Sequence, residues 1–196
     1  MNIIFSTRDY LEKIWIILEK IPLSDTPKSR YIGAMLFSAF NICDGMQPLI
    51  QNRNHASSNI LLRSLFEYIF RAFWLSRVAT DDQIFRSINS DDWPNTQTLH
   101  KSIEGKNGII DLLAKEKIKI NKILHSYSHG GNQNPISHMG QGHYITPNID
   151  DSEVIYFINI LQLSAYFILS EIIHLSGTKD FELELNTISK DLLTIT

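Results

Sequence analysis

Residues 59–77, NILLRSLFEYIFRAFWLSR, constrain the fold more than any other stretch of this sequence. The segment has neither glycine nor proline and is rich in leucine, phenylalanine and tryptophan, which predicts a helix that packs in the core. Arg63, Glu67 and Arg71 recur at steps of four, so they form one column along that helix. Charges in apolar surroundings are costly unless they are paired, so the column must have partners inside the protein or bind a ligand.

Helical periodicity continues along the rest of the chain, and no repeat, linker or alternating strand pattern appears. Thr26 before Pro27, Asn54 or Ser57, Thr80, and Asp150 are candidate N-caps. The predicted fold is therefore all-α: one domain over residues 1–196, a helical bundle of four to five long helices plus short extra helices. The predicted helices cover residues 10–21, 27–47, 59–77, 83–88, 96–103, 109–129, 154–175 and 181–193, with a weak point or kink at Gly45 and Pro48.

Composition restricts the possible settings of the protein. The chain has 196 residues, 43% of them hydrophobic, and a formal net charge of −3, so no global positive charge favours nucleic acid. Cys43 is the single cysteine, which excludes an intrachain disulfide and predicts a reducing, cytoplasmic environment. Residues 154–170 carry no charge, but their flanks are acidic, which favours a buried helix and predicts no membrane span.

Histidines gather in the second half of the sequence. The motif HSYSHGG occupies residues 125–131 and places His125 and His129 four apart, on the same side of a last helical turn that two glycines end. His138 and His143 follow, so four of the seven histidines lie within 19 residues. The segment after the glycines, residues 132–148, has no helical or strand pattern, and a loop of this length is usually functional or disordered.

A positive strip accompanies these histidines. No acidic residue occurs between positions 117 and 149, whereas Lys117, Lys119 and Lys122 are basic. Two interpretations remain open: a solvated helix face, or a contact site for a phosphate group or an RNA backbone.

Metal chemistry has weaker support. A histidine pair spaced four apart can form half of a zinc site, but the glutamate of an HExxH motif is missing between His125 and His129. Glu171 and His174 have the Glu-x-x-His spacing of di-iron bundles, with Glu67 as a possible partner, yet the sequence has no second such motif. We therefore predict no metal and no cofactor, and keep a single zinc at the histidine pair as an alternative.

The segments LLRSLFEYIFRAFWL and LHSYSHGG together resemble a group of uncharacterised bacterial all-helical proteins that share an R-x-x-x-E helix and a downstream H-x-x-x-H-G-G motif. More distantly, the chain resembles the HEPN superfamily of helical bundles, many of which are metal-independent ribonucleases in phage defence and toxin–antitoxin systems. The HEPN signature is an arginine with a histidine four to six positions beyond it. His129 matches the histidine, whereas no arginine of this chain stands at that distance before a histidine.

The resemblance and the two motifs lead to two main functional hypotheses. The first is a non-catalytic or degenerate HEPN-like bundle that binds a protein or RNA partner in a defence, toxin–antitoxin or immunity context, as a possible homodimer through residues 181–193. The alternative is a metal-independent ribonuclease, with His129 as general base, His125 as acid held by Glu67, and Arg63 and Arg71 stabilising the phosphorane. A purely structural interpretation of the charge column, as an ion network that clamps the bundle, also remains open.

Overall fold

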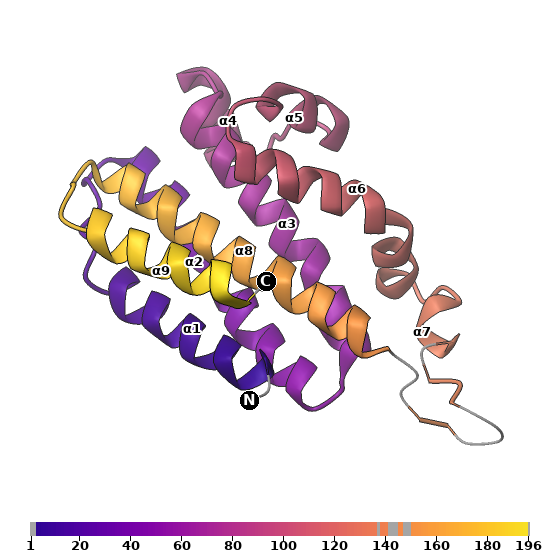
Figure 1. Cartoon of the computed structure of the whole chain (residues 1–196). Coiled ribbons are helices and arrows are strands. Elements are labelled where there is room, and N and C mark those ends of the chain that lie inside the picture. The colour runs from indigo at the N-terminus through magenta and orange to yellow at the C-terminus, as the bar shows by residue number, and fades with distance from the viewer. Residues whose placement is uncertain (1–2, 137, 141–144, 147–149, 196) are drawn as a thin grey trace.

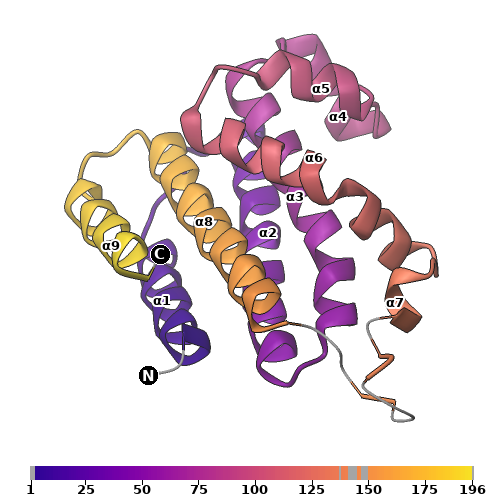
Figure 2. The ribbon, with the colours of Figure 1, turned by 45° about the vertical axis from the view of Figure 1, so that its right-hand side comes forward.

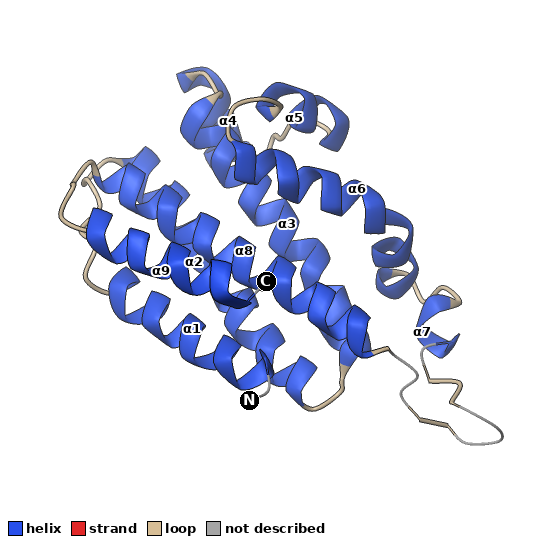
Figure 3. Ribbon diagram, in the orientation of Figure 1, coloured by secondary structure: helices blue, strands red, loops and turns tan. Residues whose placement is uncertain are grey.

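The computed structural model describes residues 3–136, 138–140, 145–146 and 150–195, and the regular elements in that part of the chain are all helices (Figure 3). This confirms the all-α prediction. Six helices are long, and the others are short segments between them. They are α1 (Ile3–Leu18), α2 (Pro27–Gln51), α3 (His55–Arg77), α4 (Asp81–Ser90), α5 (Thr96–Ile103), α6 (Gly108–Ser128), α7 (Gln133–Ile136), α8 (Asp151–Ser176) and α9 (Glu182–Ile195).

The long helices form a layered bundle (Figures 1 and 2). Helix α2 packs along α3 on one side and against α8 on the other, while α1 and α9 lie together at one edge of the bundle. Helix α6 crosses α3 at the opposite edge and also contacts α8. Helices α4 and α5 sit at one end of α3, and α7 follows the far end of α6. The edge formed by α3 and α6 therefore brings together the two motifs identified in the sequence.

The hydrophobic core is shared by the long helices, and the aromatic side chains of α3 lie within it. Phe66, Phe70 and Phe73 are buried, and the Phe73 ring meets Phe167 of α8 edge-on at a centroid distance of 5.7 Å. Burying a side chain of this size stabilises the fold by roughly 1.5–3 kcal/mol. By length and composition α8 could span a membrane, but 67% of its most apolar window is buried inside the fold, as in the core helix of a soluble protein.

Four helices, α2, α3, α4 and α8, start at the predicted capping residues. Thr26 accepts a hydrogen bond from the Ser29 backbone ahead of Pro27, Asn54 caps α3, and Asp150 caps α8. Thr80 and Gln83 form a reciprocal capping box at the start of α4. These side chains satisfy backbone N–H groups that would otherwise be unpaired at the helix ends.

The start of α1 differs from the prediction. The helix begins at Ile3 rather than at residue 10, and Thr7 lies inside it, in the packed interface with α8. Thr7 is fully buried and its hydroxyl accepts a hydrogen bond of 2.7 Å from Gln162 Nε2. A contact across 155 residues of sequence leaves no signal in local periodicity.

Helix α2 continues through Gly45 and Pro48 to Gln51. Pro48 lies in the last turn, where its missing N–H removes one helical hydrogen bond, and the buried side chains of Met46 and Ile50 on either side of it anchor the turn. The loop at residues 132–148 also differs from its prediction, because it contains α7 and an isolated antiparallel bridge between Met139 and Ile145.

One buried ion pair ties α3 to α8. The Arg77 guanidinium donates to both carboxylate oxygens of Glu171, at 3.1 Å and 2.9 Å. Glu171 is 1% exposed, so this bidentate contact compensates the desolvation of its charge. The pair fixes the C-terminal end of α3 against the last turns of α8.

Candidate functional site

The C-terminus of α6 is shaped by the two glycines of the HSYSHGG motif. His129 is the C-cap residue, Gly130 follows in the left-handed conformation with φ +68°, and Gly131 N–H donates to the Ser126 carbonyl at 2.7 Å. This is the Schellman arrangement that ends many helices. At Gly131 a Cβ atom would lie 2.3 Å from Ser126 Oγ and 3.0 Å from Ser126 Cα, so the turn requires glycine there. The motif thus fixes where the His129 ring leaves the helix.

Arg63 of α3 reaches that ring directly. Its Nη1 atom lies 3.0 Å from His129 Nε2, across a separation of 66 residues. A guanidinium can only donate, so Nε2 accepts and the ring proton of a neutral His129 sits on Nδ1. The contact joins the R-x-x-x-E helix to the histidine–glycine motif, which are the two segments singled out in the sequence.

The other predicted residues extend this contact on both sides. The His125 and His129 rings meet edge-on at a centroid distance of 4.5 Å. On the α3 side, Glu67 Oε1 lies 3.5 Å from Arg63 Nε. Glu67 therefore orients Arg63, whereas the sequence hypothesis assigned it to His125. The result is a chain of four side chains from His125 through His129 and Arg63 to Glu67, which we call the Arg63–His129 cluster.

Arg71 does not join the cluster as an ion pair. In the described part of the chain its partner is the Trp93 ring, with the guanidinium carbon 4.8 Å from the ring centroid. The interpretation of Arg63, Glu67 and Arg71 as one ion network is therefore wrong for Arg71, because the column divides between two environments. Arg63 and Glu67 face α6, and Arg71 faces the α4–α5 connection.

The column is also more exposed than its apolar sequence suggested. The side chains of Arg63 and Glu67 are 41% and 42% exposed, and both His125 and His129 are exposed. Helix α3 buries the face that carries its phenylalanines between its neighbours, and the column lies along the margin left open. The expectation of a charge column sunk into the core was wrong, because a helix rich in aromatics can still leave one narrow stripe in solvent.

Lys117 is the residue that sequence reasoning misplaced. The sequence places it in a positive strip, either solvated or in contact with a phosphate, yet it is 7% exposed, with its ammonium 5.2 Å from the Phe70 ring centroid and 3.4 Å from His100 Nε2. Burial lowers the pKa of Lys117, nearby Glu67 raises it, and Arg63 and Arg71 lower it. The signal was present in the sequence, because position 117 continues the buried stripe of Leu113, Ile120 and Leu124.

His100 is the half-buried partner of this lysine. Its ring packs edge-on against Phe70 at 4.8 Å, and burial, followed by the charge of Lys117, lowers its pKa to about 4. His100 is therefore neutral at pH 7, and its Nε2 can accept from the Lys117 ammonium. The two residues place a positive charge under the cluster without exposing it.

The rest of the predicted strip is divided among other contacts. Lys119 lies over the Tyr156 ring at 4.8 Å and 3.6 Å from Glu116, so α8 takes up part of its interactions. Lys122 is exposed. His138 lies in the loop, where its carbonyl accepts from Thr146 N–H, and His143 falls outside the described residues.

The described residues contain no group of three or more His, Cys, Asp or Glu side chains that could hold a metal ion. The di-iron alternative fails on geometry, because Glu171 is taken up by Arg77 inside the bundle while Glu67 contacts Arg63 at the surface. The zinc alternative has only the His125–His129 pair within the described part of the chain.

Fold and site together define an all-α bundle in which an R-x-x-x-E helix meets a histidine–glycine helix end through an arginine–histidine contact. The chain belongs to a family of unknown function, DUF6988, whose model matches residues 37–192 and so includes both motifs. Membership of an uncharacterised family agrees with the prediction from the sequence. No curated protein and no solved structure matches the chain.

Proposed function

We propose that this protein is a HEPN-like helical bundle that binds RNA through the phosphate backbone at the Arg63–His129 cluster. The observation that carries the proposal is the 3.0 Å contact between Arg63 Nη1 and His129 Nε2. It supplies, from two helices, the arginine and histidine that the HEPN signature combines in one segment. This geometry therefore supports the distant resemblance at the point where the sequence departs from it.

The charges around the cluster favour an anionic ligand. Lys117 interacts electrostatically with Arg63, Arg71 and Glu67, so three cations and one carboxylate make up this group. An exposed guanidinium can bind a phosphate oxygen pair through two parallel N–H donors. The overall net charge of −3 does not oppose this, because charges separated by more than about 10 Å are screened at 0.1 M salt.

Binding can be tested with a 5′-labelled single-stranded RNA of twenty nucleotides and fluorescence anisotropy in EDTA. Removing one phosphate contact costs on the order of 1–3 kcal/mol, so Arg63→Ala should weaken binding by about tenfold or more. Arg8→Ala is the matched control, because Arg8 is an exposed arginine of α1 that pairs with Asp44 away from α6. If RNA does not bind the wild-type protein, or if both variants bind like wild type, the proposal is wrong.

A second candidate function, RNA cleavage, is favoured by the edge-on contact of His125 and His129 at 4.5 Å. In this scheme the phosphate draws Arg63 away from Nε2, and His129 removes the proton of a ribose 2′-hydroxyl. The 2′-oxygen attacks the adjacent phosphorus, the bond to the 5′-oxygen breaks, and His125 protonates that oxygen. The products are a 2′,3′-cyclic phosphate and a free 5′-hydroxyl, and no metal takes part.

The two functions are separated by incubating the same RNA in EDTA with wild type, His129→Ala and His125→Ala. An RNA with a single 2′-deoxyribose serves as the control on the chemistry, because it retains every phosphate but lacks the nucleophile at one position. Cyclic-phosphate products that both variants lose, and that the deoxy position blocks, establish cleavage. Intact RNA in every sample, together with measurable affinity, leaves a binding protein.

The cellular setting follows from the same proposal. A buried free thiol at Cys43 suits the cytoplasm, and the resemblance suggests bacterial defence, toxin–antitoxin or immunity systems.

Self-association through α9 is part of the proposal, since Leu183 on that helix is 77% exposed. A protein partner in place of RNA is the outcome expected if the RNA titration fails and affinity capture recovers a defined protein.

A further inference from the structure

A cleft of about 350 Å³ opens beside the Arg63–His129 cluster. It lies between α2, α3 and the α4–α5 connection, and is large enough for a small planar ligand. Glu67 links the two places, because its carboxylate contacts Arg63 and also lines the cleft. Arg63, Glu67 and Arg71 stand about 6 Å apart along α3, so a ligand held at the cluster is within reach of the cleft.

The wall of the cleft is formed by a constrained loop. Asp91 ends α4 in the left-handed conformation with φ +52°, and its Oδ1 accepts a hydrogen bond of 2.6 Å from Trp93 Nε1. Asp is among the few residues other than glycine that tolerate this conformation. Backbone held in such a region is commonly found at ligand sites. Here it fixes both a carboxylate and an indole ring at the rim.

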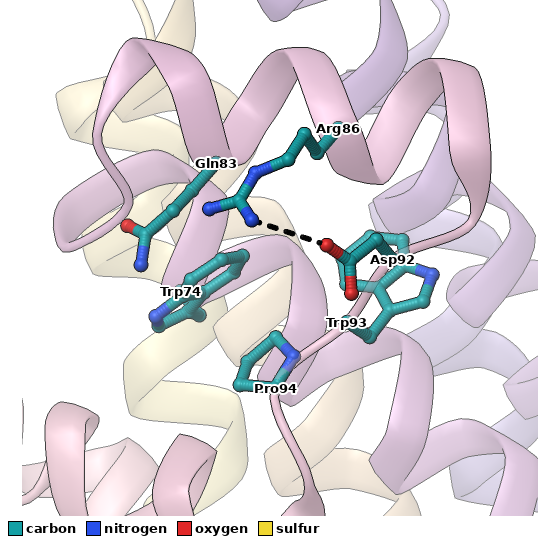
Figure 4. Close-up of a pocket in the computed structure, with 6 residues that line it drawn as sticks. All are labelled: Trp74, Gln83, Arg86, Asp92, Trp93 and Pro94. Carbon is teal, nitrogen blue, oxygen red and sulfur yellow. Dashed lines mark hydrogen bonds and ion pairs between the residues drawn. The ribbon is translucent and has the colours of Figure 1, made fainter.

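A second, smaller pocket of about 170 Å³ is also lined by Trp93 (Figure 4). Its charges are already engaged with one another, because Arg86 contacts Asp92 at 3.4 Å and Asp82 at 3.2 Å. The ring centroids of Trp74 and Trp93, which both line the pocket, lie 6.4 Å apart. This pocket therefore serves to hold the loop in place, and the larger cleft is the one with groups left for a ligand.

The groups that line the larger cleft combine aromatic and charged side chains. Tyr31 and Tyr68 offer ring faces, and Tyr68 is 38% exposed. Glu67 and Asp91 supply carboxylate acceptors. Arg71 supplies donors, and its guanidinium is spread over Trp93 rather than held by a carboxylate of the described residues. Aromatic rings can stack on the face of a nucleobase, while two carboxylate acceptors and one guanidinium donor can pair with its edge.

We propose that this cleft is a nucleobase subsite that prefers guanine, in an RNA whose backbone lies on the Arg63–His129 cluster. The inference rests on the proposed RNA binding and names its base preference. Guanine alone among the four bases presents two adjacent N–H donors, N1 and N2, beside a carbonyl acceptor, O6. The donors match a carboxylate of the cleft, and O6 matches Arg71. Adenine and cytosine each present an amino group next to a ring acceptor, which a carboxylate repels.

The test compares free guanosine, inosine and adenosine by the quenching of tryptophan fluorescence, and then RNAs with a single guanosine or inosine in an adenosine tract. Inosine differs from guanosine only in the missing N2 amino group. We expect guanosine to bind about tenfold more tightly than inosine and more tightly still than adenosine. Equal affinity for the three nucleosides would overturn the subsite.

Two variants keep the result specific to the cleft. Asp91→Asn retains an acceptor for Trp93 and tolerates the left-handed conformation, but removes the charge, so the preference for guanosine over inosine should fall at least fivefold. Asp9→Asn, on an exposed face of α1 and outside the lining of the cleft, should keep the full preference. RNA that binds without any base preference overturns this inference and leaves the proposed function intact. Guanosine that binds while RNA does not would overturn the proposed function and retain the pocket.

Discussion

Arg63 is the residue on which the candidate site depends. Its guanidinium contacts His129 on one side and Glu67 on the other, so one side chain joins α3 to the end of α6. The fork of donors allows both contacts at once, which a lysine ammonium with its single nitrogen cannot reproduce in the same geometry. Lys117 below it adds charge without using any exposed surface.

The contact between half-buried His100 and buried Lys117 predicts a particular pH dependence of stability. The pKa of His100 is about 4 in the fold, against about 6.5 for an exposed imidazole, so the unfolded chain binds the extra proton first as the pH falls. The free energy of unfolding should therefore drop between pH 6.5 and pH 4. His100→Gln keeps a hydrogen-bond acceptor for Lys117 but does not titrate, so urea unfolding at pH 7.5 and pH 5 should show a smaller loss for this variant.

Carboxylates also titrate in this range, and the comparison with His100→Gln subtracts their common contribution. Equal losses of stability in wild type and variant between pH 7.5 and pH 5 would contradict the assignment of His100 as a neutral imidazole in the fold.

Among the elements, the C-terminal turn of α6 has the most specific sequence requirement. Gly131→Ala would force a Cβ atom to within 2.3 Å of Ser126 Oγ, and overpacking of this kind typically costs about 1–3 kcal/mol. Gly45→Ala is the matched control, because no atom lies within 4 Å of its added Cβ in the exposed middle of α2. That change should stabilise the protein by about 0.5–1 kcal/mol. Urea unfolding measures the free energy of unfolding of both variants. Equal effects of the two substitutions would show that the turn tolerates a side chain.

The helices themselves could largely be predicted from the sequence. Capping residues such as Thr26, Thr80 and Asp150 mark helix starts through bonds within one turn, so local sequence is sufficient. The start of α1 was missed because Thr7 is held by Gln162, far away in the chain. Local patterns identify an element, whereas its exact length depends on what it packs against.

The candidate site was predictable only in its parts. The sequence indicated Arg63, Glu67, His125 and His129 as chemistry-bearing residues, but could not say which would touch. The contact of Arg63 with His129, and the separation of Arg71 toward Trp93, depend on the angle at which α6 and the α4–α5 connection meet α3. Trp93 and Asp91 lay in a segment interpreted as an ordinary loop, with no periodicity to indicate a cleft.

For the molecule as a whole, the order in which helices pack creates the site. Helix α3 is fixed to α8 by Arg77 and Glu171 at one end and is covered by α2, which leaves its charged margin facing α6. The bundle thereby places the Arg63–His129 cluster between α3 and α6, and the neighbouring cleft between α2, α3 and the α4–α5 connection.

The most direct test of the central proposal is the salt dependence of RNA affinity in wild type and Arg63→Ala. The logarithm of the association constant should fall linearly with the logarithm of the salt concentration, and each phosphate contact to single-stranded RNA contributes about 0.7 to the slope. We predict a slope shallower by about 0.7 in Arg63→Ala, with the slope of Arg8→Ala unchanged. Parallel lines for wild type and Arg63→Ala would contradict a phosphate contact at Arg63 and with it the proposed function.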